Sequence, residues 1–159
     1  MMLASILSLL GCNPSTPAPA KAGVSEALQY PVLLIGQASL DVRDDEAALI
    51  SIRGASSLNL VERVVLDSRG DLFRVTKAEP VAGQPSPLWS MGTQSRDFAV
   101  TLAKLRRPAW EDVQQLVLEQ VTAPNGVWNQ SEQAVARVKS FGSVAELIEA
   151  SRESWSWAR

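Results

Sequence analysis

The side chains of this sequence that are best suited to chemistry are carboxylates gathered in one short stretch. Asp41, Asp44, Asp45 and Glu46 fall within six positions. Such oxygen-rich clusters can bind calcium, but the alternating ligands and central glycine of an EF-hand loop are missing. The pattern therefore favours a solvated turn, and we expect no metal site.

Few other groups are available for catalysis. The sequence has no histidine, which removes the usual general base near neutral pH and the Ser–His and Cys–His nucleophile pairs. It also lacks GxSxG, SxxK and GxxxxGK motifs. Glu111 and Asp112 diverge if they lie on a helix, and a first-turn position beside the helix dipole already explains them. We expect no enzyme activity and no cofactor, with a hydrolase that uses carboxylates alone as an alternative.

Positive charge is concentrated in a basic patch, Lys104, Arg106 and Arg107, just before Pro108. The patch can contact anionic lipid or an acidic partner, although a solvated strand end is the simpler explanation. The whole chain carries 15 Lys and Arg against 17 Asp and Glu, so there is no excess of positive charge to bind a phosphate backbone. Nucleic acid is therefore not expected as a partner.

The five tryptophans are a high count for 159 residues. Trp110 and Trp155 fall on apolar stripes of expected helices and are assigned to the core. Trp157 follows Trp155 by two positions, about 200° around a helix, and cannot share its face. Trp89 lies in a proline-rich loop. Trp89 and Trp157 are therefore the aromatic candidates for contact with a partner.

The only cysteine, Cys12, follows a short apolar run at the start of the sequence. Met1–Leu10 has no charged side chain and is much shorter than the roughly 20 apolar residues of a membrane-spanning helix. Its length is that of the hydrophobic region of a signal peptide. A single cysteine also excludes an intrachain disulfide.

Leu9-Leu10-Gly11-Cys12 resembles the lipobox of bacterial lipoproteins, which is an aliphatic, a variable and a small residue followed by cysteine. The resemblance implies that diacylglycerol is joined to the Cys12 sulfur and that a signal peptidase cuts between Gly11 and Cys12. The new amine is then often acylated, for example with palmitate. Asn13 stands where aspartate favours retention in the inner membrane, so the outer membrane is favoured. The alternative is a cytoplasmic protein in which Cys12 is a small buried side chain.

The segment after Cys12 suits an anchor better than a buried helix. Asn13–Gly23 reads NPSTPAPAKAG, in which proline and small residues favour an extended spacer. Its 11 residues at about 3.1 Å each reach roughly 34 Å, enough to clear the lipid headgroups. We predict a signal peptide over 1–11, a lipidated cysteine and tether over 12–27, and one globular α+β domain over 28–159.

The first half of that domain is expected to form strands. Pro31–Val42 is apolar and then alternating, and a charged turn at Arg43–Glu46 leads to alternating Ala48, Ile50 and Ile52. This pattern predicts a β-hairpin.

A second hairpin is predicted from Leu60–Asp67 and Leu72–Lys77, which flank a turn where Gly70 can adopt a positive φ. The turn contains Arg-Gly-Asp, the tripeptide that integrins recognise, but these residues also suit a turn. Asp97–Leu105 fits a helix or a strand, and its β-branched residues favour a strand.

The second half is expected to form helices. One helix starts near Pro108, with an apolar stripe of Trp110, Val113, Val117 and Val121. Ser131–Lys139 predicts a shorter helix, and Ser143 with Glu146 forms a capping box for a last one. The inner face of that last helix is Val144, Leu147, Ile148, Ser151 and Trp155. The order predicts an antiparallel sheet of four to five strands, including two N-terminal hairpins, with two to three C-terminal helices packed on one face.

Together these features predict a lipid-anchored protein of the bacterial envelope whose domain faces the periplasm. We expect the domain to bind a protein partner through Trp89, Trp157 or the basic patch. An inhibitor or immunity protein that neutralises a toxin or hydrolase is the alternative.

Overall fold

The computed structural model describes residues 21–36, 39–53, 60–83, 95–124 and 132–152. The strands of these ranges are β1 (Gly23–Val24), β2 (Val32–Gly36), β3 (Ser39–Arg43), β4 (Ser51–Arg53), β5 (Val64–Asp67), β6 (Leu72–Pro80) and β7 (Ser95–Lys104). The helices are α1 (Glu46–Ile50), α2 (Trp110–Val121), α3 (Glu132–Ser140) and α4 (Val144–Arg152). The predicted α+β class is confirmed.

The sheet is mixed rather than antiparallel. Its strands follow the order β1-β7-β6-β5-β2-β3, and β4 pairs with β7 outside this order. β1 runs parallel to β7, whereas the other paired strands are antiparallel. The sheet thus has more strands than the predicted four to five, because the short β1 and β4 extend it. β1 lies within 12–27, the predicted tether, so pairing in the sheet begins at Gly23.

The first predicted hairpin is wrong in its boundaries. Pro31–Val42, predicted as one strand, contains β2 and all of β3 except Arg43, and these two strands pair with each other. Residues 46–50, predicted as the end of the charged turn and the start of the return strand, form α1. The Asp45 carboxylate accepts a hydrogen bond from the Ala48 N–H at 2.7 Å. This N-cap, with Glu46 in the first turn, stabilises a helix despite the alternating apolar residues.

The second hairpin is confirmed, since β5 and β6 pair antiparallel and Gly70 in their turn has a φ of 84°. Asp97–Leu105 is a strand up to Lys104, in β7, as its β-branched residues predict. The three C-terminal helices are confirmed as well. At the start of α4 the Ser143 hydroxyl accepts from the Glu146 N–H at 3.3 Å, whereas the Glu146 carboxylate accepts from the Gly142 N–H at 2.8 Å. In a regular capping box the Glu146 carboxylate would accept from the N–H of Ser143, whereas here it accepts from the N–H of the preceding residue.

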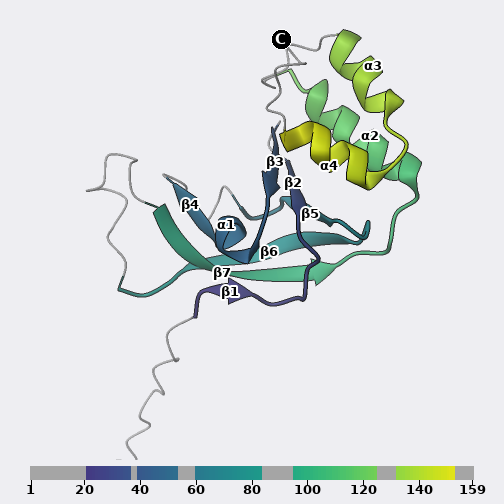
Figure 1. Cartoon of the computed structure of the whole chain (residues 1–159). Helices are drawn as coiled ribbons and strands as arrows, with labels where there is room; N and C mark the ends of the chain where they lie inside the picture. Colours follow the sequence, from purple (N-terminus) through teal and green to yellow (C-terminus); the bar gives the residue numbers. More distant parts are fainter. Residues whose placement is uncertain (1–20, 37–38, 54–59, 84–94, 125–131, 153–159) are drawn as a thin grey trace, which may run out of the picture.

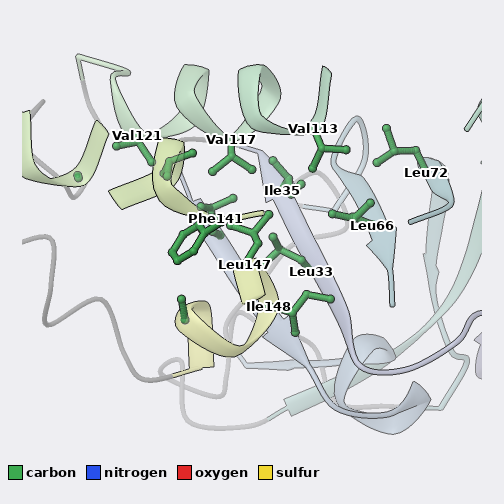
Figure 2. Close-up of a cluster of buried hydrophobic side chains, with 14 residues drawn as sticks. Leu33, Ile35, Leu66, Leu72, Val113, Val117, Val121, Phe141, Leu147 and Ile148 are labelled. Carbon is green, nitrogen blue, oxygen red and sulfur yellow. The ribbon is translucent and has the colours of Figure 1, made fainter. Parts of the chain in front are cut away.

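Both faces of the sheet carry a buried cluster. The first lies between the sheet and α2–α4, and Figure 2 shows it. Its members include Leu33, Ile35, Leu66, Val113, Val117, Val121, Phe141, Leu147 and Ile148. The second, on the side of α1, includes Val32, Leu34, Leu49, Val65, Phe73, Val75, Phe98 and Val100. Alternate residues of β2 enter opposite clusters, which explains why its sequence is continuously apolar.

Two irregularities bend the sheet at Val75 in β6. The Glu62 N–H donates to the Val75 carbonyl and the Val75 N–H donates to the Arg63 carbonyl, each at 2.9 Å. Glu62 and Arg63 thus form a bulge opposite the single residue Val75. The pairing of β6 with β7 also shifts between Val75 and Lys77. Because bulges increase strand twist, β6 and β7 turn across the other strands (Figure 1). Side chains of β6, β7 and α1 contribute to the second cluster.

Glu62 occupies a bulge position that favours glycine. Its φ is 70° and its side chain is exposed. We expect Glu62→Gly to raise the free energy of unfolding by about 1 kcal/mol, because a left-handed backbone costs a non-glycine residue roughly that much. Urea denaturation measures the change. Glu62→Ala is the matched control and should give no gain, because it keeps the Cβ atom; equal stabilisation by both variants would contradict the assignment.

Tyr30, the only tyrosine, places a hydroxyl group against the second cluster. Its buried oxygen has no hydrogen-bond partner among the described residues. Burial, followed by the charges of Glu46 and Asp45, raises the pKa of Tyr30 from 10.0 to about 12. Because the folded chain holds this proton more tightly than the unfolded chain, stability should fall as the pH rises from about 10 to about 12.

We therefore expect Tyr30→Phe to lose less stability than the wild type over that alkaline range. At pH 7 the variant should be about 1 kcal/mol more stable, because it removes an unpaired buried hydroxyl. Denaturation at neutral and alkaline pH measures both effects, and an absorbance titration follows the tyrosine directly. A Tyr30 pKa near 10 in the folded protein, or parallel pH profiles for the two chains, would refute the prediction.

Candidate functional site

A buried carboxylate holds the turn between β5 and β6. Asp67, the last residue of β5, is 0% exposed. Its Oδ1 accepts hydrogen bonds from the backbone N–H of Arg69 at 3.0 Å and of Asp71 at 2.9 Å. Its Oδ2 accepts from the Gln29 N–H at 3.3 Å and from the Arg69 guanidinium at 3.3 and 3.2 Å. These partners compensate a charge whose burial is otherwise costly.

The same turn is fastened to the segment before β2. The Ser68 N–H and hydroxyl both donate to the Gln29 carbonyl at 3.0 Å. Within the turn the Gly70 N–H donates to the Asp67 carbonyl at 2.9 Å. The turn is therefore fixed by its own backbone and by a distant part of the chain.

The structure places two residues of the predicted basic patch beside this turn. Lys104 Nζ lies 3.3 Å from Asp71 Oδ2 and 5.7 Å from the centre of the Phe73 ring. Arg107 donates to the carbonyl oxygen of Arg69, and its Nε lies 3.9 Å from Asp71 Oδ1. A merely solvated strand end is thus too simple an explanation, because both cations are attached to the turn.

The cations of this cluster face outward and the carboxylates lie beneath them. The side chains of Arg69 and Arg107 are 50% and 67% exposed, whereas those of Asp67 and Asp71 are 0% and 14% exposed. Arg106, 90% exposed, lies 4.0 Å from Asp112. The exposed surface here is therefore positive, although the chain as a whole is acidic.

A cavity of about 210 Å³ adjoins these arginines, and we call it the arginine cavity. Arg69 and Arg107 supply its charged lining, and Pro108, Trp110 and Val144 supply apolar lining. The Trp110 indole N–H donates to the Phe141 carbonyl at 3.1 Å, which holds the ring in place. The cavity thus joins fixed cations to a fixed aromatic surface.

The carboxylates that cluster at 41–46 in the sequence bind different parts of the fold in the structure. Asp41 pairs with Arg63 at 3.0 Å, Asp44 pairs with Arg152, Asp45 caps α1, and Glu46 accepts from the Val24 N–H at 3.0 Å. Within the described ranges no three His, Cys, Asp or Glu side chains come together to hold a metal ion. Three of the four carboxylates connect distant parts of the chain and Asp45 caps a helix, which the prediction of a solvated turn did not include.

Several predicted site residues lie outside the described part of the chain. These are Gly11, Cys12, Trp89 and Trp157. The Asp112 carboxylate accepts from the Ala109 N–H at 3.2 Å, in agreement with its assignment to a helix start. None of the helices in the described ranges is long and apolar enough to cross a membrane.

Asp67 was not among the residues predicted from the sequence, and Arg69 was not connected with the basic patch. A signal was present in Asp67-Ser68-Arg69-Gly70-Asp71, because an aspartate before a turn commonly accepts hydrogen bonds from backbone N–H groups within it. The Arg-Gly-Asp tripeptide is not displayed freely, since Arg69 binds Asp67 and Asp71 pairs with Lys104. The turn therefore has a structural role.

No protein-family model matches this chain, and no curated protein or solved structure matches it either. Its function has to be inferred from its own residues and contacts.

We expect Asp67→Asn to lower the free energy of unfolding by about 3 kcal/mol. The amide nitrogen would face N–H donors, and the Arg69 guanidinium would lose its anionic partner. Glu79→Gln is the matched control, because it removes a carboxylate from an exposed pair with Lys77 and should change stability by less than about 0.5 kcal/mol. Urea denaturation measures both, and similar small losses would contradict the role assigned to Asp67.

Proposed function

We propose that this protein is lipid-anchored in the bacterial envelope and that its domain faces the periplasm and binds a protein partner without catalysing a reaction. The observation that carries the proposal is Leu9-Leu10-Gly11-Cys12, followed directly by the spacer NPSTPAPAKAG. A thiol is needed to form the thioether with diacylglycerol, and a small residue before it gives the peptidase access to the bond. Asn13 favours the outer membrane.

Acyl chains explain how so short an apolar segment can hold a protein on a bilayer. One chain binds only weakly, with an association constant of about 10⁴ M⁻¹, whereas two or more chains give stable attachment. A diacylglycerol on Cys12 supplies two chains, and acylation of the new amine adds a third. This arrangement needs no membrane-spanning helix.

The start of the domain suits a tether that enters at one edge of the sheet. β1 begins at Gly23, the last residue of the spacer, and the Ser25 N–H donates to the Val100 carbonyl at 3.0 Å. The Ser25 hydroxyl accepts from the Leu102 N–H at 2.9 Å. These bonds fasten the chain to β7 immediately after the spacer, so the domain is attached through a paired strand.

Partner binding is assigned to the arginine cavity and the exposed cations around it. Arg69 is held by Asp67, and Arg107 is held by the Arg69 carbonyl and by Asp71. Because these side chains are already ordered, a partner does not pay the full entropic cost of fixing them. This preorganisation favours recognition of an acidic group.

Lipidation is tested on the protein from the cells that produce it. We expect mass spectrometry to find Cys12 as the N-terminal residue with diacylglycerol on its sulfur, and fractionation to place the protein with membranes. Cys12→Ala should carry no lipid, because no thioether can form, and it should retain residues 1–11. Ser15→Ala, in the spacer, is the control and should be lipidated normally. An unmodified wild-type N-terminus in the cytosolic fraction would refute the proposal.

A further inference from the structure

We propose that the arginine cavity binds the C-terminal residue of a partner polypeptide. The terminal carboxylate would lie between Arg69 and Arg107, and an apolar side chain of the same residue would lie against Trp110. The inference rests on the proposed function, because it names the chemistry by which the partner is recognised.

The two arginines retain capacity for an external acceptor. Arg69 donates through Nε and one terminal nitrogen to Asp67, and Arg107 donates through one terminal nitrogen to the Arg69 carbonyl. A guanidinium is a planar fork with further N–H groups beyond these, and both side chains are at least half exposed. A carboxylate matches such a fork with two parallel hydrogen bonds.

The charge next to the cavity favours an anion. Three cations, Arg69, Lys104 and Arg107, face two carboxylates, Asp67 and Asp71, which leaves one positive charge. At the end of the cavity near α4, the carboxylate of Glu146 is already bound to the Gly142 N–H. Asp112 is near Arg106, outside the cavity lining.

The size and the lining of the cavity favour a terminal residue over other anions. Its volume of about 210 Å³ is below the roughly 300–1,000 Å³ of pockets that enclose small-molecule ligands, so one residue of a larger partner fits better. Pro108, Trp110 and Val144 offer apolar contact beside the arginines. A C-terminal apolar residue brings a carboxylate and an apolar side chain together. An internal Asp or Glu lacks the separate apolar side chain, and a phosphate brings only the charge.

The test uses the full-length chain with Cys12→Ser, which prevents lipidation, in detergent solution. NMR follows the indole N–H resonance of Trp110, which is assigned with Trp110→Phe, during titration with N-acetyl-leucine. N-acetyl-leucinamide, which lacks the charge, and inorganic phosphate are titrated in parallel. We expect a saturable shift with N-acetyl-leucine and at least about tenfold weaker binding of the other two, the loss typical of a charge-assisted hydrogen-bonded pair.

Several outcomes would overturn the inference. An equal response to the acid and the amide would show that the cavity does not recognise the carboxylate. Binding of phosphate as tight as that of N-acetyl-leucine would assign the cavity to phosphate groups. No saturable shift at millimolar concentrations would also overturn it. The ligand comparisons all use the same chain, and Trp110→Phe serves only to assign the indole resonance.

A matched pair of variants locates the binding. Arg107→Gln should weaken the affinity for N-acetyl-leucine by about tenfold. Arg74→Gln removes the same charge from an exposed position of β6, outside the cavity lining, and should leave the affinity unchanged. Equal weakening by both would indicate general charge attraction and would contradict the site. Circular dichroism confirms that each variant is folded.

The inference and the proposed function fail separately. A native protein without lipid that still binds N-acetyl-leucine would refute the location and leave the cavity assignment intact. A lipidated protein whose Trp110 resonance does not respond would refute the cavity assignment alone.

Discussion

One buried charge determines the conformation of the turn on which the candidate site depends. Removing a carboxylate from water costs several kcal/mol unless partners replace the water, and Asp67 finds three backbone N–H groups and a guanidinium. One of those partners, Gln29, is 38 residues away in the sequence. Any rearrangement of the turn would leave the charge without some of these partners, so the fold permits one arrangement.

The order imposed by Asp67 extends to the surface through successive contacts. Its bond to Arg69 sets the position of that guanidinium, and the Arg69 carbonyl receives Arg107. Asp71, whose N–H is bound to Asp67, pairs in turn with Lys104. The cations beside the arginine cavity are thus held in position by buried groups of the turn, and binding of an anion there would not require the chain to rearrange.

Local signals sufficed for much of the fold, and tertiary contacts decided the rest. The β5–β6 turn, β7 and the three C-terminal helices could be predicted because caps, a turn glycine and regular apolar stripes determine them. The β2–β3 hairpin was not predicted because both faces of β2 are buried, which makes its sequence continuously apolar. The helix α1 was not predicted because its apolar residues alternate as in a strand. For the site, Lys104 and Arg107 were visible as a basic run, but their carboxylate partners come from a distant turn.

Hydrogen exchange at the backbone amides of Arg69 and Asp71 tests the role of Asp67 most directly. Both amides lie in a surface turn, where exchange is ordinarily fast because local opening needs little free energy. If Asp67 holds them as described, they should exchange only through global unfolding, as slowly as the amide of Leu34 in β2. Fast exchange at Arg69 and Asp71 while Leu34 stays protected would contradict the account.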